Sequence, residues 1–516
     1  MHPRAAALLA SSLLSACGAA PDVGSDSTDA TASTSASTTG ASTTASSTAA
    51  STDVATTGGP PTSSTTLDAS STSTAASSGA STGEPAADAW IQRFGAPEDQ
   101  HPTGLGFAPQ GDLWVAGDFF AQSLELGTGP LMGDGTGLYL GKYAPDGAAL
   151  HSQALFPADG APTLSNVAGL AVDGAGAVVL TGWLEGSYTV GGAPLVADEV
   201  DFYVGKWDAA GAPLWGQKFG AADWQVSYSL AIAGDDSIWI GGATLAPFEV
   251  GDIALTGTAS TGMFAVRLAA DGAPILARWW GDVGDQEVRG IAACADGSAA
   301  IAGFFTAPLQ FGAELVEPAG DKDMFVARIT ATGDPAWIRA YGSASVDYAA
   351  LVHCDDAVTF AGLVAGSAQV GDLELDPAGD TDVVVGRLDA DGALAWATGV
   401  TGPADQRPTG LVARPGGETL LALTSAGATK FGAQEHTSAG DTDLFVARYT
   451  DTDPNPAELQ VLGDRGAQSA GPLALGPAGA AALAGTISGT VAWPGLPPVT
   501  AAGPVDLVLV HFMTGP

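Results

Sequence analysis

The feature that most constrains this chain is an internal repeat with a period of about 60 residues, which is typical of stacked arrays and propellers. Short aromatic phrases such as "WGQKFG" and "WIRAYG" end on a glycine, and from Gly220 onward the spacing between these glycines varies by no more than one position. The first gap, from Gly95 to Gly220, is twice as long and holds two units, so residues 90–513 contain about seven. A lone unit of this size would leave an apolar sheet face uncovered, so each unit must pack against its neighbours. The glycines are Gly95, Gly220, Gly281, Gly342, Gly402 and Gly463.

Each unit has the pattern of four short strands. The runs are rich in Val, Ile, Ala and aromatic residues and are bounded by Gly, Asp and Pro, which is typical of strands and hairpins. They are apolar on both faces, as in "AVVLTGWL" at 177–184. A sheet that is covered on both sides by its neighbours requires such a pattern. In the fourth unit the expected strands are 290–296, 298–305, 323–329 and 336–342.

The two ends of the repetitive region are complementary. It begins with a fourth-strand phrase, "AWIQRFG" at 89–95, and stops with a third-strand phrase, "VDLVLVHFM" at 505–513. A ring can dock the first phrase onto the last unit and so remove the open edge, whereas a linear solenoid leaves both edges bare. A β-helix has much shorter coils, and a unit of this length is too short for a sandwich domain. We therefore predict an all-β fold, a seven-bladed β-propeller over residues 89–516.

The repeated unit resembles a bacterial family. "GLAVDGAGAVVLTGWL" at 169–184, followed by "DFYVGKWDAAGAPLWGQKFG" at 201–220, is similar to the seven-bladed propeller repeats often called SBBP repeats. The resemblance covers about residues 90–513, although Gly137 and Gly262 stand where other units carry an Asp, and the second unit lacks the fourth-strand Trp. Such repeats are common in secreted and lipid-anchored proteins. The resemblance implies a scaffold outside the cytoplasm and implies no reaction.

Residues 1–17 have the pattern of a lipoprotein signal peptide. Arg4 precedes a short apolar run, and the segment ends in "LSAC", which resembles the lipobox of bacterial lipoproteins. We expect cleavage before Cys17 and lipid on this cysteine. The signal that retains such lipoproteins in the inner membrane is an Asp directly after the cysteine, and here that residue is Gly18. We therefore expect an outer-membrane anchor, with the protein facing the periplasm or the cell surface. A plain secretory signal that happens to contain a cysteine is the alternative.

Residues 18–88 are dominated by Ser, Thr, Ala and Gly. Such a segment cannot bury enough apolar surface to offset its ordering entropy. We therefore expect a disordered linker that tethers the propeller to its anchor.

Composition bounds the possible partners. With 56 acidic and 17 basic residues, the formal net charge is −39, which repels the phosphate backbone of a nucleic acid. Membrane contact is expected through the lipid alone, and the protein is expected to be a monomer.

The six His show no HExxH spacing, and no G-x-S-x-G elbow or Walker-type loop occurs. The sequence therefore favours a non-enzymatic scaffold that binds a protein or a glycan; the alternative is a carbohydrate-active hydrolase or lyase with carboxylates at the channel mouth.

A pair of acids recurs immediately before the third strand of several units. Carboxylates on a tight turn suit calcium, so each pair is a weak candidate for a metal site. The other interpretation is that the Asp caps its own turn by accepting backbone N–H bonds, and this is favoured because no D-x-D-x-D-G loop accompanies the pair. No other cofactor is expected. The candidates are Asp321, Asp323, Asp380, Asp382, Asp441 and Asp443.

A second set of polar residues lies between each fourth strand and the next first strand. In propellers these loops gather at one mouth of the central channel, where ligands commonly bind. Turn formation with solvated side chains is the other interpretation. The binding candidates are Asp99, Gln100, Asp285, Gln286, Asp405 and Gln406.

Two further cysteines, Cys294 and Cys354, lie near the ends of the first strands in adjacent units. An oxidising compartment favours a disulfide, provided that the Cα atoms lie within about 7 Å of each other. Two separate buried thiols are the alternative.

Overall fold

The computed structural model describes residues 89–95, 99–155, 165–258, 260–377, 379–414, 417–450 and 453–514. The predicted signal peptide and linker, residues 1–88, lie outside them. The only helical segment among the described residues is a 3-10 turn at Pro477–Gly479. Within the same part of the chain, no helix has the length and apolar character needed to cross a membrane.

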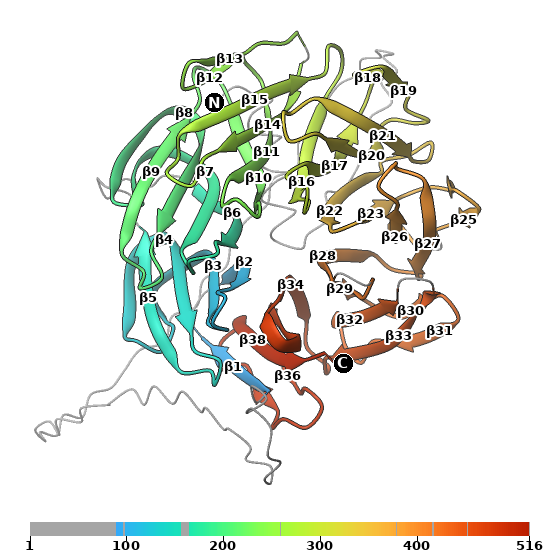
Figure 1. The fold of residues 1–516 in the computed structure, drawn as a ribbon. Coiled ribbons are helices and arrows are strands. Elements are labelled where there is room, and N and C mark those ends of the chain that lie inside the picture. Colours follow the sequence, from blue (N-terminus) through green and yellow to red (C-terminus); the bar gives the residue numbers. More distant parts are fainter. Residues whose placement is uncertain are drawn as a thin grey trace, which may run out of the picture. The chain divides into compact units, whose positions relative to one another are not determined.

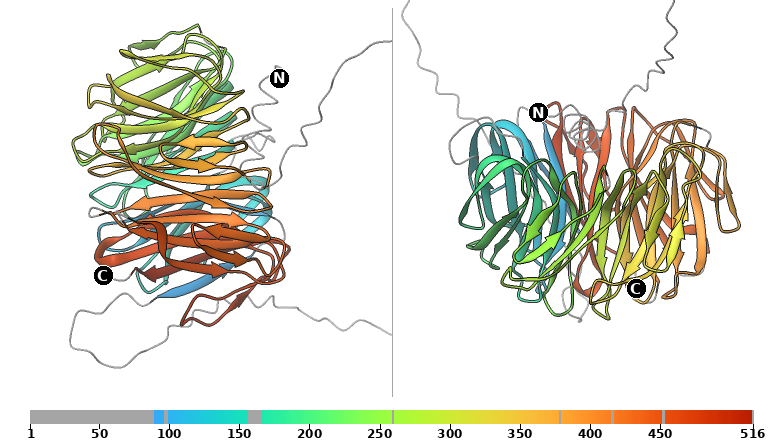
Figure 2. Two further views of the ribbon diagram at one scale, coloured as in Figure 1. Left: turned by 90° about the vertical axis from the view of Figure 1, so that its right-hand side faces the viewer. Right: turned by 90° about the horizontal axis from the view of Figure 1, so that it is seen from above.

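Seven antiparallel blades of four strands each stand side by side in a ring, and the first strand of each lines the central channel (Figure 1). Figure 2 shows the same blades from the side. The predicted all-β, seven-bladed propeller is confirmed. From the channel outward, blade 1 comprises β2 (Gln100–Phe107), β3 (Leu113–Glu125), β4 (Pro130–Tyr143) and β5 (Ala149–Leu155). Blade 2 comprises β6 (Ser165–Val172), β7 (Val178–Val190), β8 (Ala193–Trp207) and β9 (Pro213–Phe219). Blade 3 comprises β10 (Gln225–Ile232), β11 (Ile238–Thr244), β14 (Gly262–Leu268) and β15 (Pro274–Trp280).

The remaining four blades repeat this order. Blade 4 comprises β16 (Gln286–Ala293), β17 (Ala299–Phe305), β20 (Asp323–Ile329) and β21 (Pro335–Tyr341). Blade 5 comprises β22 (Tyr348–Cys354), β23 (Val358–Val364), β26 (Asp382–Leu388) and β27 (Leu394–Thr401). Blade 6 comprises β28 (Gln406–Ala413), β29 (Thr419–Ser425), β32 (Asp443–Thr450) and β33 (Asp453–Leu462). Blade 7 comprises β34 (Gln468–Leu475), β35 (Ala480–Ile487), β38 (Asp506–Met513) and β1 (Trp90–Phe94).

Small hairpins connect the second and third strands of blades 3 to 7. In blades 1 and 2 the corresponding residues extend the two strands themselves, β3 with β4 and β7 with β8. The hairpins are β12 (Phe248–Val250) with β13 (Ile253–Leu255), β18 (Leu309–Phe311) with β19 (Glu314–Val316), β24 (Ala368–Val370) with β25 (Leu373–Leu375), β30 (Ala428–Phe431) with β31 (Gln434–Thr437), and β36 (Thr490–Val491) with β37 (Val499–Thr500).

The hydrophobic core is divided among the junctions between blades. All seven residues of β17 are buried, because both faces of its sheet pack against neighbouring sheets. At the junction of blades 4 and 5, Ala300 and Met324 share a cluster with Phe360 and Val384. Burial on both faces explains why the strands are apolar throughout and do not alternate with polar residues.

Blade 7 is closed by the N-terminal strand, as the sequence predicts. β1 pairs with β38, and Trp90 lies opposite His511, with their rings stacked at a centroid distance of 5.5 Å. The Nη1 atom of Arg93 lies 2.6 Å from the Oδ2 atom of the buried Asp506. Phe94 joins the cluster shared by blades 7 and 1. The last blade therefore combines segments from opposite ends of the domain.

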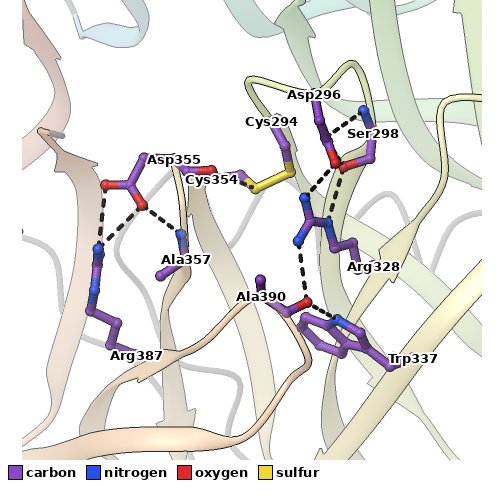
Figure 3. The surroundings of a disulfide bond; sticks show 10 residues. All are labelled: Cys294, Asp296, Ser298, Arg328, Trp337, Cys354, Asp355, Ala357, Arg387 and Ala390. Atoms are coloured by element: carbon purple, nitrogen blue, oxygen red, sulfur yellow. Dashed lines mark hydrogen bonds and ion pairs between the residues drawn. A yellow bond between two sulfur atoms is a disulfide. The ribbon is translucent and has the colours of Figure 1, made fainter.

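A disulfide joins the inner strands of blades 4 and 5 (Figure 3). Cys294 follows β16 and Cys354 ends β22, and their Cα atoms are 4.9 Å apart. Of the two alternatives left open by the sequence, the structure has the bonded pair. An ion pair lies on each side of it: Arg328 bonds to Asp296 in one blade, and Arg387 bonds to Asp355 in the next.

Candidate binding site at the channel mouth

The loops that join neighbouring blades all lie at one end of the channel. Because neighbouring strands of a blade are antiparallel, the first strand begins at the same end of the blade at which the fourth strand ends. The second strand also ends there, and the third begins there. Backbone bridges link the residue before a third strand to the loop that enters the next blade, for example Thr261 to Asp285 and Lys322 to Val346. We call this end of the channel the mouth.

The three predicted glutamines are enclosed, and two of them bond to these loops. The side chains of Gln100, Gln286 and Gln406 are fully buried. The amide of Gln286 donates to the Val283 carbonyl, and that of Gln406 donates to the Ala404 carbonyl. Because these side chains are enclosed, a ligand at the mouth meets their neighbours first.

The predicted aspartates lie on the rim but not together. Asp99 is exposed, whereas Asp285 accepts a hydrogen bond from Ser260 and Asp405 accepts one from Thr381. They belong to blades 1, 4 and 6, no two of which are neighbours. A ligand that spans one blade junction therefore contacts no more than one of them.

The acidic pairs divide into one buried and one exposed member. Asp323, Asp382 and Asp443 are buried, whereas Asp321, Asp380 and Asp441 are exposed. The buried acids accept bonds from nearby backbone: Asp323 from Ala319 N–H, Asp443 from Ala439 N–H at 3.0 Å, and Asp382 from Gly402 N–H at 3.1 Å. Burial raises the pKa of Asp323 and of Asp443, although the backbone bonds act in the opposite direction.

This geometry is what turn capping requires. Among the described residues, no three His, Cys, Asp or Glu side chains come close enough together to hold a metal ion. Turn capping stays the favoured prediction for these acids, with calcium binding as the alternative.

A group of charged and aromatic side chains at the mouth was not predicted. It comes from blades 3, 4 and 5, and we call it the three-blade cluster. Four members lie on the inner strands, Phe304 lies near the end of β17, and Lys322 lies directly before β20. The members are Tyr228, Glu287, Arg289, Phe304, Lys322 and Tyr348.

Close contacts connect the members of the three-blade cluster. The Nε atom of Arg289 lies 2.6 Å from an oxygen of Glu287, whose side chain is fully buried. The Arg289 guanidinium lies over the Tyr228 ring, 4.1 Å from its centroid. The Lys322 ammonium lies 3.8 Å from the centroid of the Phe304 ring. Two cations thus rest on aromatic faces around one buried carboxylate.

The surroundings alter the acid–base behaviour of the cluster. Burial lowers the pKa of Lys322, although Glu287 opposes this effect. Burial acts to lower the pKa of Arg289, but Glu287, Tyr228 and Tyr348 together outweigh this effect and the pKa is raised. Burial raises the pKa of Tyr228 well above its usual value, so its hydroxyl stays protonated. The cluster therefore gathers two basic groups on a chain whose net charge is −39.

A comparison of the units position by position would have found the cluster. In the inner strands of blades 1 to 6, a register shift near the start of the strand removes one residue from the regular alternation, which makes a bulge. Blades 3 and 4 place Tyr228 and Arg289 there. The equivalent residues in four other blades are small: Thr103, Ala168, Ala350 and Thr409.

Blade 1 carries a second polar pair on the mouth. The Nδ1 atom of His101 lies 3.0 Å from the Oδ2 atom of Asp118, which is buried. The hydrogen bond to Asp118 raises the pKa of His101, against the effect of burial. His101 lies on β2 and Asp118 on β3 of blade 1, three blades away from Glu287 in blade 4.

No family model and no curated protein matches this chain. Among solved structures, it is similar to a puromycin hydrolase, with 14% identity, a TM-score of 0.41, and coverage of 75% of this chain and 50% of the hydrolase. The chain thus spans about half the length of that enzyme. A protein of unknown function from Dyadobacter fermentans has 9% identity and a TM-score of 0.36, over 82% of this chain and 98% of its own. A gluconolactonase from Xanthomonas campestris has 15% identity and a TM-score of 0.30, over 65% and 86%. Similarities at this level support no inference about activity.

Proposed function

We propose that the protein is a non-enzymatic scaffold that binds a protein or glycan ligand at the channel mouth. The observation that carries this proposal is the three-blade cluster. Six charged or aromatic side chains gather on adjacent blades, and two of them occupy bulge positions where other blades have small residues. Large aromatic and arginine side chains supply most of the binding energy in typical recognition sites.

A binding role fits these contacts better than catalysis does. A glycosidase needs two carboxyl groups within about 5 to 10 Å of each other. Glu287 is engaged by Arg289, and the buried Asp118 belongs to blade 1, three blades away around the ring. The carbohydrate-active alternative therefore gains no support from this pair.

The binding proposal predicts a loss of affinity when the cluster is changed. Residues 86–516 should be probed against glycan and protein arrays, and any hit titrated with variants. Lys322→Gln and Tyr228→Ala should weaken binding by roughly tenfold or more, since loss of a hot-spot contact costs about 2 kcal/mol or more.

The matched control is Arg278→Ala, which removes a surface cation from the outer strand β15, away from the mouth. Undiminished affinity in both cluster variants would show that the ligand binds elsewhere. Turnover of a glycan hit would favour the hydrolase or lyase.

We propose, in addition, that Cys17 carries a lipid that anchors the protein outside the cytoplasm, in the outer membrane. The "LSAC" sequence and the Ser/Thr-rich segment behind it support this location. The wild-type protein should partition with membranes, and Cys17→Ser should move it to the soluble fraction. A variant that stays with the membranes would refute the lipid anchor.

A further inference from the structure

The blades are connected by a repeated contact on the face opposite the mouth. Near the end of the third strand of blades 1 to 4, a lysine or arginine reaches the next blade and donates to a backbone carbonyl in the turn between that blade's third and fourth strands. The four pairs seen among the described residues are Lys142 with Ala209 at 2.8 Å, Lys206 with Ala270 at 3.1 Å, Arg267 with Ala331 at 2.9 Å, and Arg328 with Ala390 at 3.2 Å.

A tryptophan on the fourth strand often binds the same turn. The indole N–H of Trp337 donates to the Ala390 carbonyl at 2.9 Å, the acceptor that Arg328 also uses. The turn fits closely against the ring, because a Cβ added to Gly392 would lie 2.7 Å from Trp337. Gly392 also has a φ of +79°, which favours glycine. At these junctions a Gly-containing turn thus fills the space beside the cation.

The junction from blade 6 to blade 7 cannot have this turn. The third and fourth strands of blade 7, β38 and β1, come from opposite ends of the domain, so no hairpin connects them. In blade 6 the repeated cation is Arg448, and Glu458 replaces the tryptophan. Among the described residues, Arg448 bonds only within its own blade: Nε to Glu458 at 3.1 Å, and Nη1 near Glu418 at 3.7 Å. Its Nη2 donors remain for another acceptor.

A cavity of about 140 Å³ lies at this junction. Its polar side is formed by Arg448, Glu458 and Gln460, and its apolar side includes Trp493 and Phe512. The two aromatic rings are 4.3 Å apart, and Trp493 comes from the segment between β36 and β37. In Figure 1 this region lies where β38 meets β32 and β33. The cavity therefore combines a cation, an amide and an aromatic surface.

We propose that this cavity binds a tight, glycine-containing turn of a partner protein. The turn would occupy the position that the turn between the third and fourth strands occupies at the other junctions. One of its backbone carbonyls would accept from Arg448, and a small side chain would contact Trp493. The inference is independent of the mouth, because the cavity belongs to a different junction and to the opposite face of the ring. A neutral turn suits it best, because Glu458 and Glu418 already surround Arg448.

The test is a titration of the full-length protein with a backbone-cyclised peptide that carries the turn Thr-Ala-Thr-Gly, copied from residues 330–333. Cyclisation fixes the turn in advance and so reduces its ordering cost. We expect saturable binding by calorimetry. Arg448→Ala should weaken it by roughly tenfold or more, since it removes a charged hydrogen-bond donor. Trp493→Ala should weaken it as well.

The matched control is Arg328→Ala, the equivalent substitution at a junction that is already filled. It should lower the melting temperature and leave peptide affinity unchanged. Absence of saturable binding, or an equal loss of affinity in Arg328→Ala, would overturn the proposal. A concentration-dependent dimer that Arg448→Ala abolishes would also overturn it, because the occupant would then be a second copy of this chain.

Discussion

Deletion of residues 89–95 is expected to cause the largest loss of stability in this protein. The deletion removes the buried side chains of Trp90, Ile91 and Phe94 and leaves the edge of β38 unpaired. Loss of one buried Trp or Phe side chain alone costs about 3–5 kcal/mol. It also strips Asp506 of its Arg93 partner, and a buried charge without a partner adds to the cost. Thermal unfolding followed by circular dichroism measures the effect.

The control is a deletion of equal length, residues 40–46, from the Ser/Thr-rich segment. It should leave the melting temperature unchanged, because that segment was predicted to contribute no buried surface. Equal melting temperatures for both deletions and the parent would contradict the closure of the ring by β1.

Loss of the disulfide is expected to give the next largest effect. The bond links residues that are 60 apart in sequence, and closing a loop of this size stabilises a protein by about 2–4 kcal/mol. The double variant Cys294→Ser and Cys354→Ser should therefore unfold at a lower denaturant concentration than the parent. Reductant should lower the midpoint of the parent to the same extent and leave the variant unaffected.

Cys17→Ser serves as the control for this experiment, since it leaves the pair intact and should keep the response to reductant. A parent whose midpoint does not respond to reductant, and whose two cysteines react as free thiols after unfolding, would show that the bond is not formed.

The sequence was enough to predict how the chain forms a ring. A constant period with four strands in each unit gives the number of blades, since sheets with two apolar faces must be covered on both sides. Residues 89–95 match the fourth strand of a unit whose first three strands do not precede them. Residues 505–513 match the third strand of a unit without a fourth, so the two segments complete one blade. These features are local strand patterns or matches between repeats, and both can be read directly from the amino-acid sequence.

The sites depend on distances between side chains of neighbouring blades. The alignment of equivalent positions in the repeats does not give these distances. Gln286 and Arg289 lie on one strand, yet the first is enclosed and the second faces Tyr228 of the preceding blade, because Arg289 occupies the bulge. The 4.9 Å between the Cα atoms of Cys294 and Cys354 likewise depends on how closely two inner strands approach.

The sequence by itself determined the repeat, the strands and the exchange that closes the ring, because hydrophobic period and turn residues act on neighbours along the chain. Only the tertiary structure decided which side chains meet across blades, as Arg289 meets Tyr228. It also decided that the junction beside Arg448 contains a cavity, whereas four other junctions contain a turn. The physical reason is that contacts between blades join residues a whole repeat apart in the sequence, and their geometry follows from sheet packing and bulges.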